Sequence, residues 1–193
     1  MSEGFIPKHG GYKNLLSYQR SQWVYDATVR FCDRFVPRGD RTRDQMVQAA
    51  RSGKQNIIEG SQVSGTSKEL ELKLTNVARA SLEELIEDYR DFLRLRGVEE
   101  WGRDHAHARQ LSKRLRMADC SYETFKGGLE HEDAAISANA ILGLTKVTCY
   151  LLDQQIKQLE QAFLKEGGLR EAMTRARLDA RRKRDASEGT EGT

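Results

Sequence analysis

Proline is scarce in this chain, and its scarcity constrains the fold more than any other feature of the sequence. The two prolines are Pro7 and Pro37, so about 150 residues follow Pro37 without the residue that breaks helices most strongly. A β-sandwich would need more turn-forming residues than this sequence contains. The apolar content of 38% and the charged content of 32% are typical of a soluble, highly charged helical protein. The sequence therefore predicts an all-α fold with a buried core.

Hydrophobic periodicity predicts four long helices, at about residues 15–36, 44–60, 66–96 and 132–165. We expect Asn14 to cap the first helix, and Thr66 with Glu69 to form a capping box for the third. Glycines would end the last three helices: Gly60, Gly97, and Gly167 with Gly168. Four long amphipathic helices indicate an antiparallel up-down four-helix bundle.

The remaining segments complete the expected domain organisation. The expected domains are an N-terminal extension (1–13), the bundle (14–166) and a basic C-terminal helical suffix with a disordered end (167–193). A linker inside the bundle, at about 98–131, has weaker periodicity and predicts one extra short helix around Leu111 and Leu115. This helix is heavily basic, through Arg109, Lys113, Arg114 and Arg116.

Two features of the predicted helices indicate tight packing and self-association. Gly53 faces inward in the middle of the second helix, where glycine lowers helix propensity, so we expect it to permit the close approach of a neighbouring helix. The third helix carries two apolar stripes: Leu70, Leu74, Val77, Ser81 and Leu85, and then Ala78, Leu82, Tyr89 and Leu93. A lone bundle would partly expose Ala78, Leu82 or Leu93, and burial by another subunit is the usual solution. The sequence therefore predicts a homo-oligomer.

The N-terminus and the cysteines indicate a cytoplasmic protein. The N-terminus has no basic segment followed by an apolar one, so we do not expect secretion. The longest charge-free stretch in a helical pattern, residues 134–145, is far shorter than the roughly 20 residues that a membrane span requires. The cysteines are odd in number and widely spaced, which argues against a disulfide framework: Cys32, Cys120 and Cys149.

Groups that could serve catalysis or metal binding have simpler explanations. His105 and His107 would point to different sides of a helix, whereas two metal ligands from one helix need a spacing of three or four. The Glu-x-x-His motif of a di-iron bundle does not occur, and Gly60–Gly65 lacks the Lys and Ser/Thr of a phosphate-binding loop. We therefore expect no enzyme activity, metal or cofactor.

Basic residues on the second and third helices form the candidate nucleic-acid site: Arg41, Arg43, Arg51, Lys54, Lys68, Arg79, Arg90 and Arg94. Arg43, Arg51 and Lys54 lie within about 80° on one flank and could face one phosphate backbone. A partly buried subunit boundary is the alternative for these three. Carboxylates such as Glu83 equally favour an ordinary solvated surface for the third helix.

The suffix contains a second basic run, in which cations outnumber Glu171 and Asp179: Arg170, Arg175, Arg177, Arg181, Arg182, Lys183 and Arg184. Such a run is either a helix that docks nucleic acid or a partner protein, or a solubilising end. The sequence leaves both interpretations open.

Two segments resemble a known family. Residues 49–60, Ala-Ala-Arg-Ser-Gly-Lys-Gln-Asn-Ile-Ile-Glu-Gly, with Ser67-Lys-Glu downstream, resemble the four-helix bundle proteins first noted in intervening sequences of bacterial 23S ribosomal RNA genes. The accessory variability determinant of diversity-generating retroelements looks like a member of the same family. The resemblance covers about residues 12–97 and resumes in the fourth helix, and 149–177 look like the extension of a longer, suffix-domain form. Lys54 and Gln55 stand where the shorter members have Pro and Ser.

The resemblance implies a homopentamer without enzyme activity whose basic surface binds RNA or DNA. In the retroelement member the ring also engages a reverse transcriptase, which makes a reverse transcriptase an implied partner. The residues themselves suggest a structural motif formed by Gly53, Asn56, Glu59 and Gly60. Glu59 would accept backbone N–H groups from the turn leading to Thr66, and Asn56 would hydrogen-bond to the third helix.

Two functional hypotheses follow from the sequence. The first is a non-enzymatic oligomeric module that binds nucleic acid through Arg and Lys, beside a protein partner. The alternative is a structural or protein-interaction scaffold with no nucleic-acid role. Salt dependence distinguishes them, because phosphate contacts release counterions and weaken steeply as salt rises.

Overall fold

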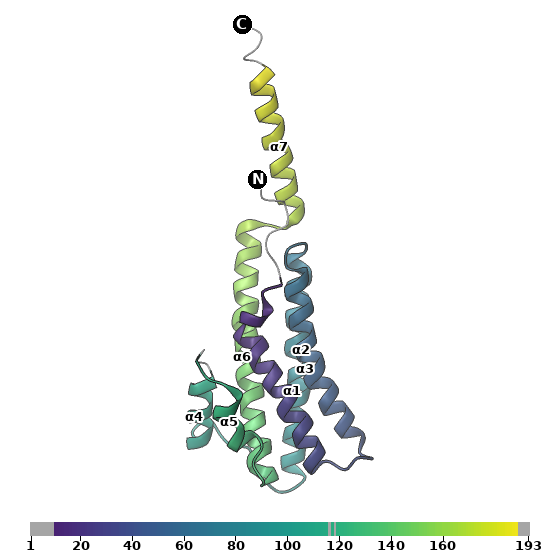
Figure 1. Cartoon of the computed structure of the whole chain (residues 1–193), viewed down its shortest axis with the longest axis vertical. Helices are drawn as coiled ribbons and strands as arrows, with labels where there is room; N and C mark the ends of the chain where they lie inside the picture. The colour runs from purple at the N-terminus through teal and green to yellow at the C-terminus, as the bar shows by residue number, and fades with distance from the viewer. Residues whose placement is uncertain (1–9, 116, 118, 189–193) are drawn as a thin grey trace.

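The computed structural model describes residues 10–115, 117 and 119–188, and within these ranges it is all-helical, as predicted (Figure 1). The helices in chain order are η1 (Tyr12–Asn14), α1 (Leu16–Phe35), α2 (Arg41–Val63), α3 (Lys68–Arg94), α4 (Ala106–Leu115), α5 (Tyr122–Leu129), α6 (Ala134–Glu166) and α7 (Leu169–Glu188). Most of the predicted N-terminal extension and residues 189–193 of the suffix lie outside the described residues.

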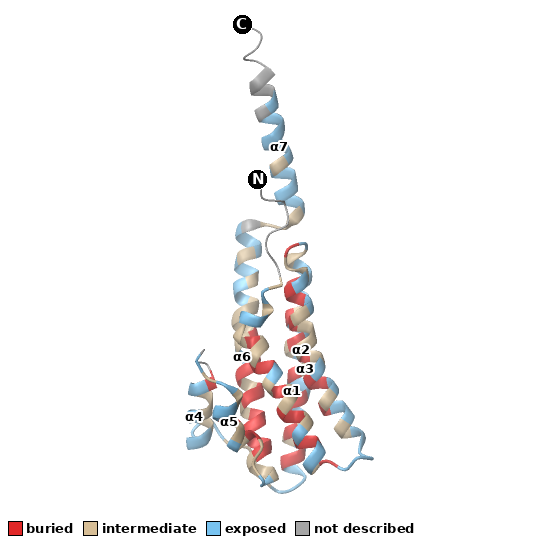
Figure 2. Cartoon of the chain, viewed as in Figure 1, coloured by how far each residue is buried: buried red, intermediate tan, exposed pale blue. Residues whose placement is uncertain are grey.

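The four long helices α1, α2, α3 and α6, called the helical core below, surround one apolar interior. α2 contacts α3, α3 contacts α6, α6 contacts α1 and α1 contacts α2, so the contacts close into a ring. Figure 2 shows the buried residues concentrated on the sides of these helices that face one another. α4 and α5 pack against α6, whereas α7 extends away from the core (Figure 1).

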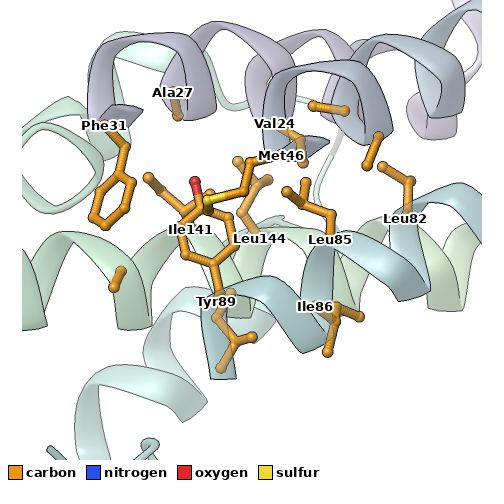
Figure 3. Close-up of a cluster of buried hydrophobic side chains, with 14 of the residues drawn as sticks. Val24, Ala27, Phe31, Met46, Leu82, Leu85, Ile86, Tyr89, Ile141 and Leu144 are labelled. Carbon is orange, nitrogen blue, oxygen red and sulfur yellow. The ribbon is translucent and has the colours of Figure 1, made fainter. Parts of the chain in front are cut away.

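Side chains from all four helices meet in the interior, as Figure 3 shows. Phe31 of α1 and Tyr89 of α3 are in edge-to-face contact, with ring centroids 5.1 Å apart, and both are almost completely buried. The Tyr89 hydroxyl donates a hydrogen bond of 3.1 Å to the Thr28 hydroxyl, so the buried phenol keeps a polar partner. Met46 of α2 and Ile141 of α6 fill the space beside these rings (Figure 3).

Two glycines allow α2 to lie close to α3. A Cβ on Gly53 would lie 2.6 Å from Leu82 Cδ2, and a Cβ on Gly60 would lie 3.4 Å from the Glu71 carbonyl oxygen. The prediction that Gly53 permits a close helix approach is confirmed. The prediction that Gly60 ends the helix is wrong, because α2 continues to Val63 and Gly60 is a second packing position.

Two predicted caps and one predicted helix start differ from the observed ones. Asn14 lies in η1, and α1 begins after Leu15, which forms no side-chain cap. α2 begins earlier than predicted because Asp40 accepts the Thr42 N–H at 2.9 Å. The cap of α3 is Ser67, whose hydroxyl accepts the Leu70 N–H at 3.1 Å; the Thr66 hydroxyl donates to a backbone carbonyl of α2 instead.

The apolar stripe of α3 that contains Ala78, Leu82 and Leu93 is covered by helices of the same chain. Ala78, Leu82 and Leu93 are at most 1% exposed, so the expectation that a lone subunit exposes them is wrong. The reason is that α2 and α6 both pack on α3 and cover its two sides. The exposed apolar side chains lie instead on the other stripe, where Leu70 and Val77 are each 41% exposed.

The linker holds two short helices rather than the one predicted, since α5 follows α4 before α6 begins. Phe125 and Leu129 of α5 are buried, which explains why this segment is helical despite its two glycines. The predicted fourth helix corresponds to α6, capped by the Asp133 side chain, which accepts the Ala135 N–H at 2.7 Å. Gly97, with a φ of +66°, follows α3 as predicted.

One helical stretch, Ala134–Arg182, contains an 18-residue window with mean hydropathy 1.4, long and apolar enough by composition to cross a membrane. The charge-free run at 134–145 underestimates this apolar length, because Lys146 is the single charge before Asp153. However, 67% of the window is buried inside the protein. A helix buried in a protein core passes the same test of length and composition.

Candidate nucleic-acid interface

The excess positive charge of the chain is concentrated in α7. This helix contains seven of the 32 Lys and Arg residues and four of the 29 Asp and Glu residues, so its formal net charge of +3 equals that of the whole chain. The rest of the sequence is formally neutral. Any long-range attraction of polyanions therefore depends on this segment more than on the helical core.

The arginines of α7 are presented to solvent. Within the described residues, five of them are exposed and form no ion pair: Arg170, Arg175, Arg177, Arg181 and Arg182. The spacings of seven and four place Arg170, Arg177 and Arg181 on one face of the helix, over about 16 Å. A cationic row of this length can follow several consecutive phosphates.

All four candidate cations on α3 face carboxylates. The pairs at helical spacing are Lys68–Glu71, Arg79–Glu83, Arg90–Glu87 and Arg94–Asp91. Arg79 also reaches Asp153 of α6 at 3.4 Å, and Arg90 also reaches Glu100 at 2.9 Å. A cation that already faces a carboxylate must exchange this partner for a phosphate, which reduces its contribution to nucleic-acid binding.

The structure separates the three candidate residues predicted to share one flank of α2. Arg43 forms an ion pair with Asp33 of α1, and the Lys54 ammonium lies 4.1 Å from the centroid of the Tyr25 ring, also on α1. These two cations therefore belong to the contact between α1 and α2. Two candidates on α2 are exposed and form no ion pair in the described part of the chain: Arg41 and Arg51.

In the predicted motif of Gly53, Asn56, Glu59 and Gly60, the two glycines allow the close contact with α3, whereas the two polar side chains do not bond to α3. The Asn56 amide donates to the Ser52 carbonyl of the preceding turn at 2.9 Å rather than to α3. The Glu59 side chain is exposed and makes no hydrogen bond among the described residues. In the turn that Glu59 was expected to bind, the backbone N–H of Thr66 donates to the Val63 carbonyl at the end of α2 instead, at 2.9 Å.

A second cationic feature lies beside α6. The end of α3, the segment 100–103, α4 and α6 enclose a groove of about 990 Å³, called the α4–α6 groove below. Among the predicted site residues, only Arg90 lines it. The basic character of the linker segment at Arg109 and Lys113 was visible in the sequence, but its position opposite α6 was not.

Two buried contacts build the groove. A Cβ on Gly143 would lie 2.7 Å from Leu111 Cδ2, so this glycine allows α4 to seat closely on α6. The Asn139 side chain, which belongs to a residue only 3% exposed, accepts a hydrogen bond from the backbone N–H of Trp101 at 2.7 Å. Its amide group donates to the Glu99 carbonyl at 3.2 Å. These bonds hold the segment before α4 against the side of α6.

The charges around the groove are unevenly compensated. Glu100 lies between Arg90 and Lys146 and accepts hydrogen bonds from both. Burial alone would raise the pKa of this carboxyl, but the two cations lower it below its usual value. The rim cations Arg103, Arg109 and Lys113 are exposed and form no ion pair within the described residues. The groove is therefore cationic.

Trp101 brings the two linker histidines together. Its indole stacks on the His105 ring with centroids 4.9 Å apart and contacts His107 edge-on at 5.3 Å. The two imidazoles are themselves 5.3 Å apart, which corrects the expectation that they point to different sides of a helix. The reason is that His105 precedes the first residue of α4. Among the described residues, no group of three His, Cys, Asp or Glu side chains could hold a metal ion.

Arg20 fixes the linker to α1 and was not identified from the sequence. Its guanidinium is fully buried and donates to the Leu115 carbonyl at 2.9 Å, to the Met117 carbonyl at 2.5 Å and to Cys120 Sγ at 3.0 Å. Burial lowers the pKa of this guanidinium. The available signal was that Arg20 continues the apolar stripe of Val24 toward the N-terminus.

The cysteines form no disulfide; all three are free, as expected. Cys32 and Cys149 are buried, and burial raises the pKa of each thiol to about 12. A thiol with so high a pKa is a poor nucleophile at neutral pH.

No family model, no curated protein and no solved structure matches this chain.

Proposed function

We propose that this chain is a non-enzymatic nucleic-acid-binding module in which α7 makes the main phosphate contacts. The observation that carries the proposal is the segregation of charge: α7 holds the entire net charge of +3, and five of its arginines, at positions 170, 175, 177, 181 and 182, are exposed and form no ion pair within the described residues. Of the eight candidate cations on α2 and α3, by contrast, five face carboxylates. Phosphate binding by Lys and Arg requires cations that are free to release counterions and approach the backbone.

We further propose that the helical core is an antiparallel up-down four-helix bundle that assembles into a homo-oligomer in the cytoplasm. The ring of contacts among the four helices supports the bundle, and the exposed apolar side chains of Leu70 and Val77 support a subunit interface on α3. The family resemblance favours five subunits and a reverse transcriptase as protein partner. Sedimentation equilibrium tests the assembly, and a 22.0 kDa monomer at micromolar concentration would contradict it.

Fluorescence anisotropy with labelled single-stranded RNA and DNA tests the nucleic-acid proposal. The test variant replaces Arg170, Arg177 and Arg181 with alanine, which keeps helix propensity and removes three charges. We expect weaker binding and a salt slope, in log–log form, that falls by about 2, because each single-strand phosphate contact contributes about 0.7.

A matched control removes the same charge elsewhere. Arg38, Lys73 and Lys157 are exposed and unpaired in the described structure, so their replacement by alanine lowers the net charge equally. This control should retain most of the affinity and the salt slope. Equal losses in both triple variants would show that total charge, rather than α7, determines binding.

The scaffold hypothesis is favoured by a different observation on the same helix. Met173 and Leu178 of α7 are 44% and 50% exposed, so this helix offers apolar as well as basic side chains to a protein partner. If the chain binds neither RNA nor DNA at low salt, the nucleic-acid proposal fails. In that case replacing Met173 by lysine should release a co-purified protein partner.

A further inference from the structure

The α4–α6 groove is a candidate for a second binding site, because it is cationic and none of its described lining residues belongs to α7. We propose that it binds one nucleoside phosphate, with the phosphate on the rim cations and the base against the Trp101 surface. Such a ligand is available as a free nucleotide or as the end of a nucleic-acid strand. The inference does not rest on the role of α7, because no described side chain of that helix lines the groove.

The shape and lining of the groove suit a ligand of this size. Its volume of about 990 Å³ lies at the upper end of the range of small-molecule sites. Leu142 and Val147 of α6 are at most 4% exposed and provide an apolar floor. The seating of Leu111 on Gly143 and the Asn139 hydrogen bonds fix the walls. The groove is therefore formed before any ligand arrives.

The cations are placed to bind a phosphate. Arg109 and Lys113 are four residues apart on α4, both line the groove, and both are exposed without a carboxylate partner in the described structure. Arg103 lines the groove from the segment before α4. Glu100 does not repel an anion strongly, since Arg90 and Lys146 already compensate its charge. Three cations that line the groove therefore form no ion pair in the described structure and are available to bind one phosphate group.

The aromatic and polar groups favour a nucleoside over a simple anion. Trp101 lines the groove, and His105 stacks on one face of its indole with an interplanar angle of 8°, which leaves the other face of the indole for a base. The Ser112 hydroxyl lines the groove and has no hydrogen-bond partner among the described residues, so it can bind a base edge or a ribose hydroxyl. An inorganic anion or an acidic peptide would use the cations but leave the aromatic surface unused.

Tryptophan fluorescence of the full-length chain tests the inference. The chain has two tryptophans, so Trp23→Phe leaves Trp101 as the only indole and retains an aromatic ring beside Phe125. This protein is titrated with ATP, with sodium tripolyphosphate, with a poly-glutamate peptide and with a 5′-phosphorylated RNA decamer. We expect saturable quenching of Trp101 by ATP or by the decamer, and no comparable effect of tripolyphosphate or the peptide.

Charge reversals identify the binding surface. The double variant with Arg109→Glu and Lys113→Glu should raise the dissociation constant measured by quenching at least about tenfold. The reason is that charge-assisted hydrogen bonds to phosphate are lost. Arg103→Glu tests the same rim from outside α4. The matched control, Arg114→Glu with Lys157→Glu, changes two exposed cations that do not line the groove and should stay within about twofold. Far-UV circular dichroism should be unchanged in all of these variants.

The outcomes separate the ligand sources and the two proposals. Quenching by ATP supports a free nucleotide, and quenching by the decamer alone supports a strand end. The inference is overturned if neither ligand quenches Trp101, if tripolyphosphate or the peptide quenches equally, or if the rim variants bind as the control does. Decamer binding seen by anisotropy without any Trp101 response would overturn the groove site and leave the α7 proposal standing.

Discussion

Replacing Gly53 by alanine has two opposite effects on the free energy of unfolding: it improves the helix propensity of α2, and it overpacks the contact between α2 and α3. Propensity alone favours alanine by about 1 kcal/mol in a helix interior. The added Cβ would lie 2.6 Å from Cδ2 and 2.7 Å from Cγ of Leu82, so the whole isobutyl group must move. Leu82 is fully buried, protein interiors are close-packed, and overpacking of this kind costs about 1–3 kcal/mol. The difference between the two contributions is about 0–2 kcal/mol, so we expect Gly53→Ala to lower the free energy of unfolding by up to about 2 kcal/mol.

Urea denaturation followed by far-UV circular dichroism measures this change, with Gly127→Ala as the matched control. Gly127 is helical and exposed, and a Cβ there meets no atom within 4 Å, so this substitution should stabilise α5 by about 0.5–1 kcal/mol. In a Leu82→Ala background the clash is removed, and Gly53→Ala should become stabilising as well. If Gly53→Ala stabilises the native chain as much as the control does, the close approach of α2 and α3 is refuted.

Three further substitutions test other parts of the fold. Arg20→Met removes the donor of the Leu115 carbonyl, so amide hydrogen exchange should accelerate in α4 and α5 but not in α2, as measured by mass spectrometry. Asp40→Ala removes the cap of α2 and should lower the free energy of unfolding by about 1 kcal/mol in urea denaturation. Burial raises the pKa of Asp88 to about 6, with smaller contributions from nearby carboxylates, so the folded state holds a proton that the unfolded chain releases. Stability is therefore lost as pH rises from about 4 through 6, and Asp88→Asn should abolish this loss in urea titrations at several pH values.

The long helices and the role of Gly53 were predictable because both depend on local sequence. Apolar residues at spacings of three and four identify a helix face without knowledge of its neighbours. An inward glycine in that face indicates close packing for the same reason. The helix ends were less predictable, because Ser67 and Thr66 are both good caps and the final turn geometry decides between them.

The partner that covers an apolar stripe was not predictable from periodicity. The stripe of Ala78 and Leu82 requires burial, but the pattern does not say whether another subunit or another helix of the same chain provides it. Here α2 and α6 provide it. The exposure of Leu70 and Val77 could not be separated from this burial by sequence, because both stripes have similar composition.

The pairing of the α3 cations was partly visible in the sequence. Glu83 follows Arg79 by four residues, which is a spacing that forms ion pairs on any helix. The contact of Arg79 with Asp153 joins residues far apart in the chain and requires the fold. The α4–α6 groove likewise depends on a contact between residues far apart in the chain, Leu111 and Gly143, and could not be predicted without the fold. An inward glycine in the middle of α6 was nevertheless a signal of close packing, like Gly53 in α2.

Charge pairing also determines which substitutions can report on nucleic-acid binding. Reversing Arg79 would place a carboxylate opposite Glu83 and Asp153 and disturb the contact of α3 with α6. A loss of affinity in that variant would mix a change in the fold with a change in binding. The arginines at 170, 177 and 181 have no carboxylate partner in the described structure, so their removal leaves no buried charge unpaired. A loss of affinity there, without a change in the free energy of unfolding, reports on the ligand contact alone.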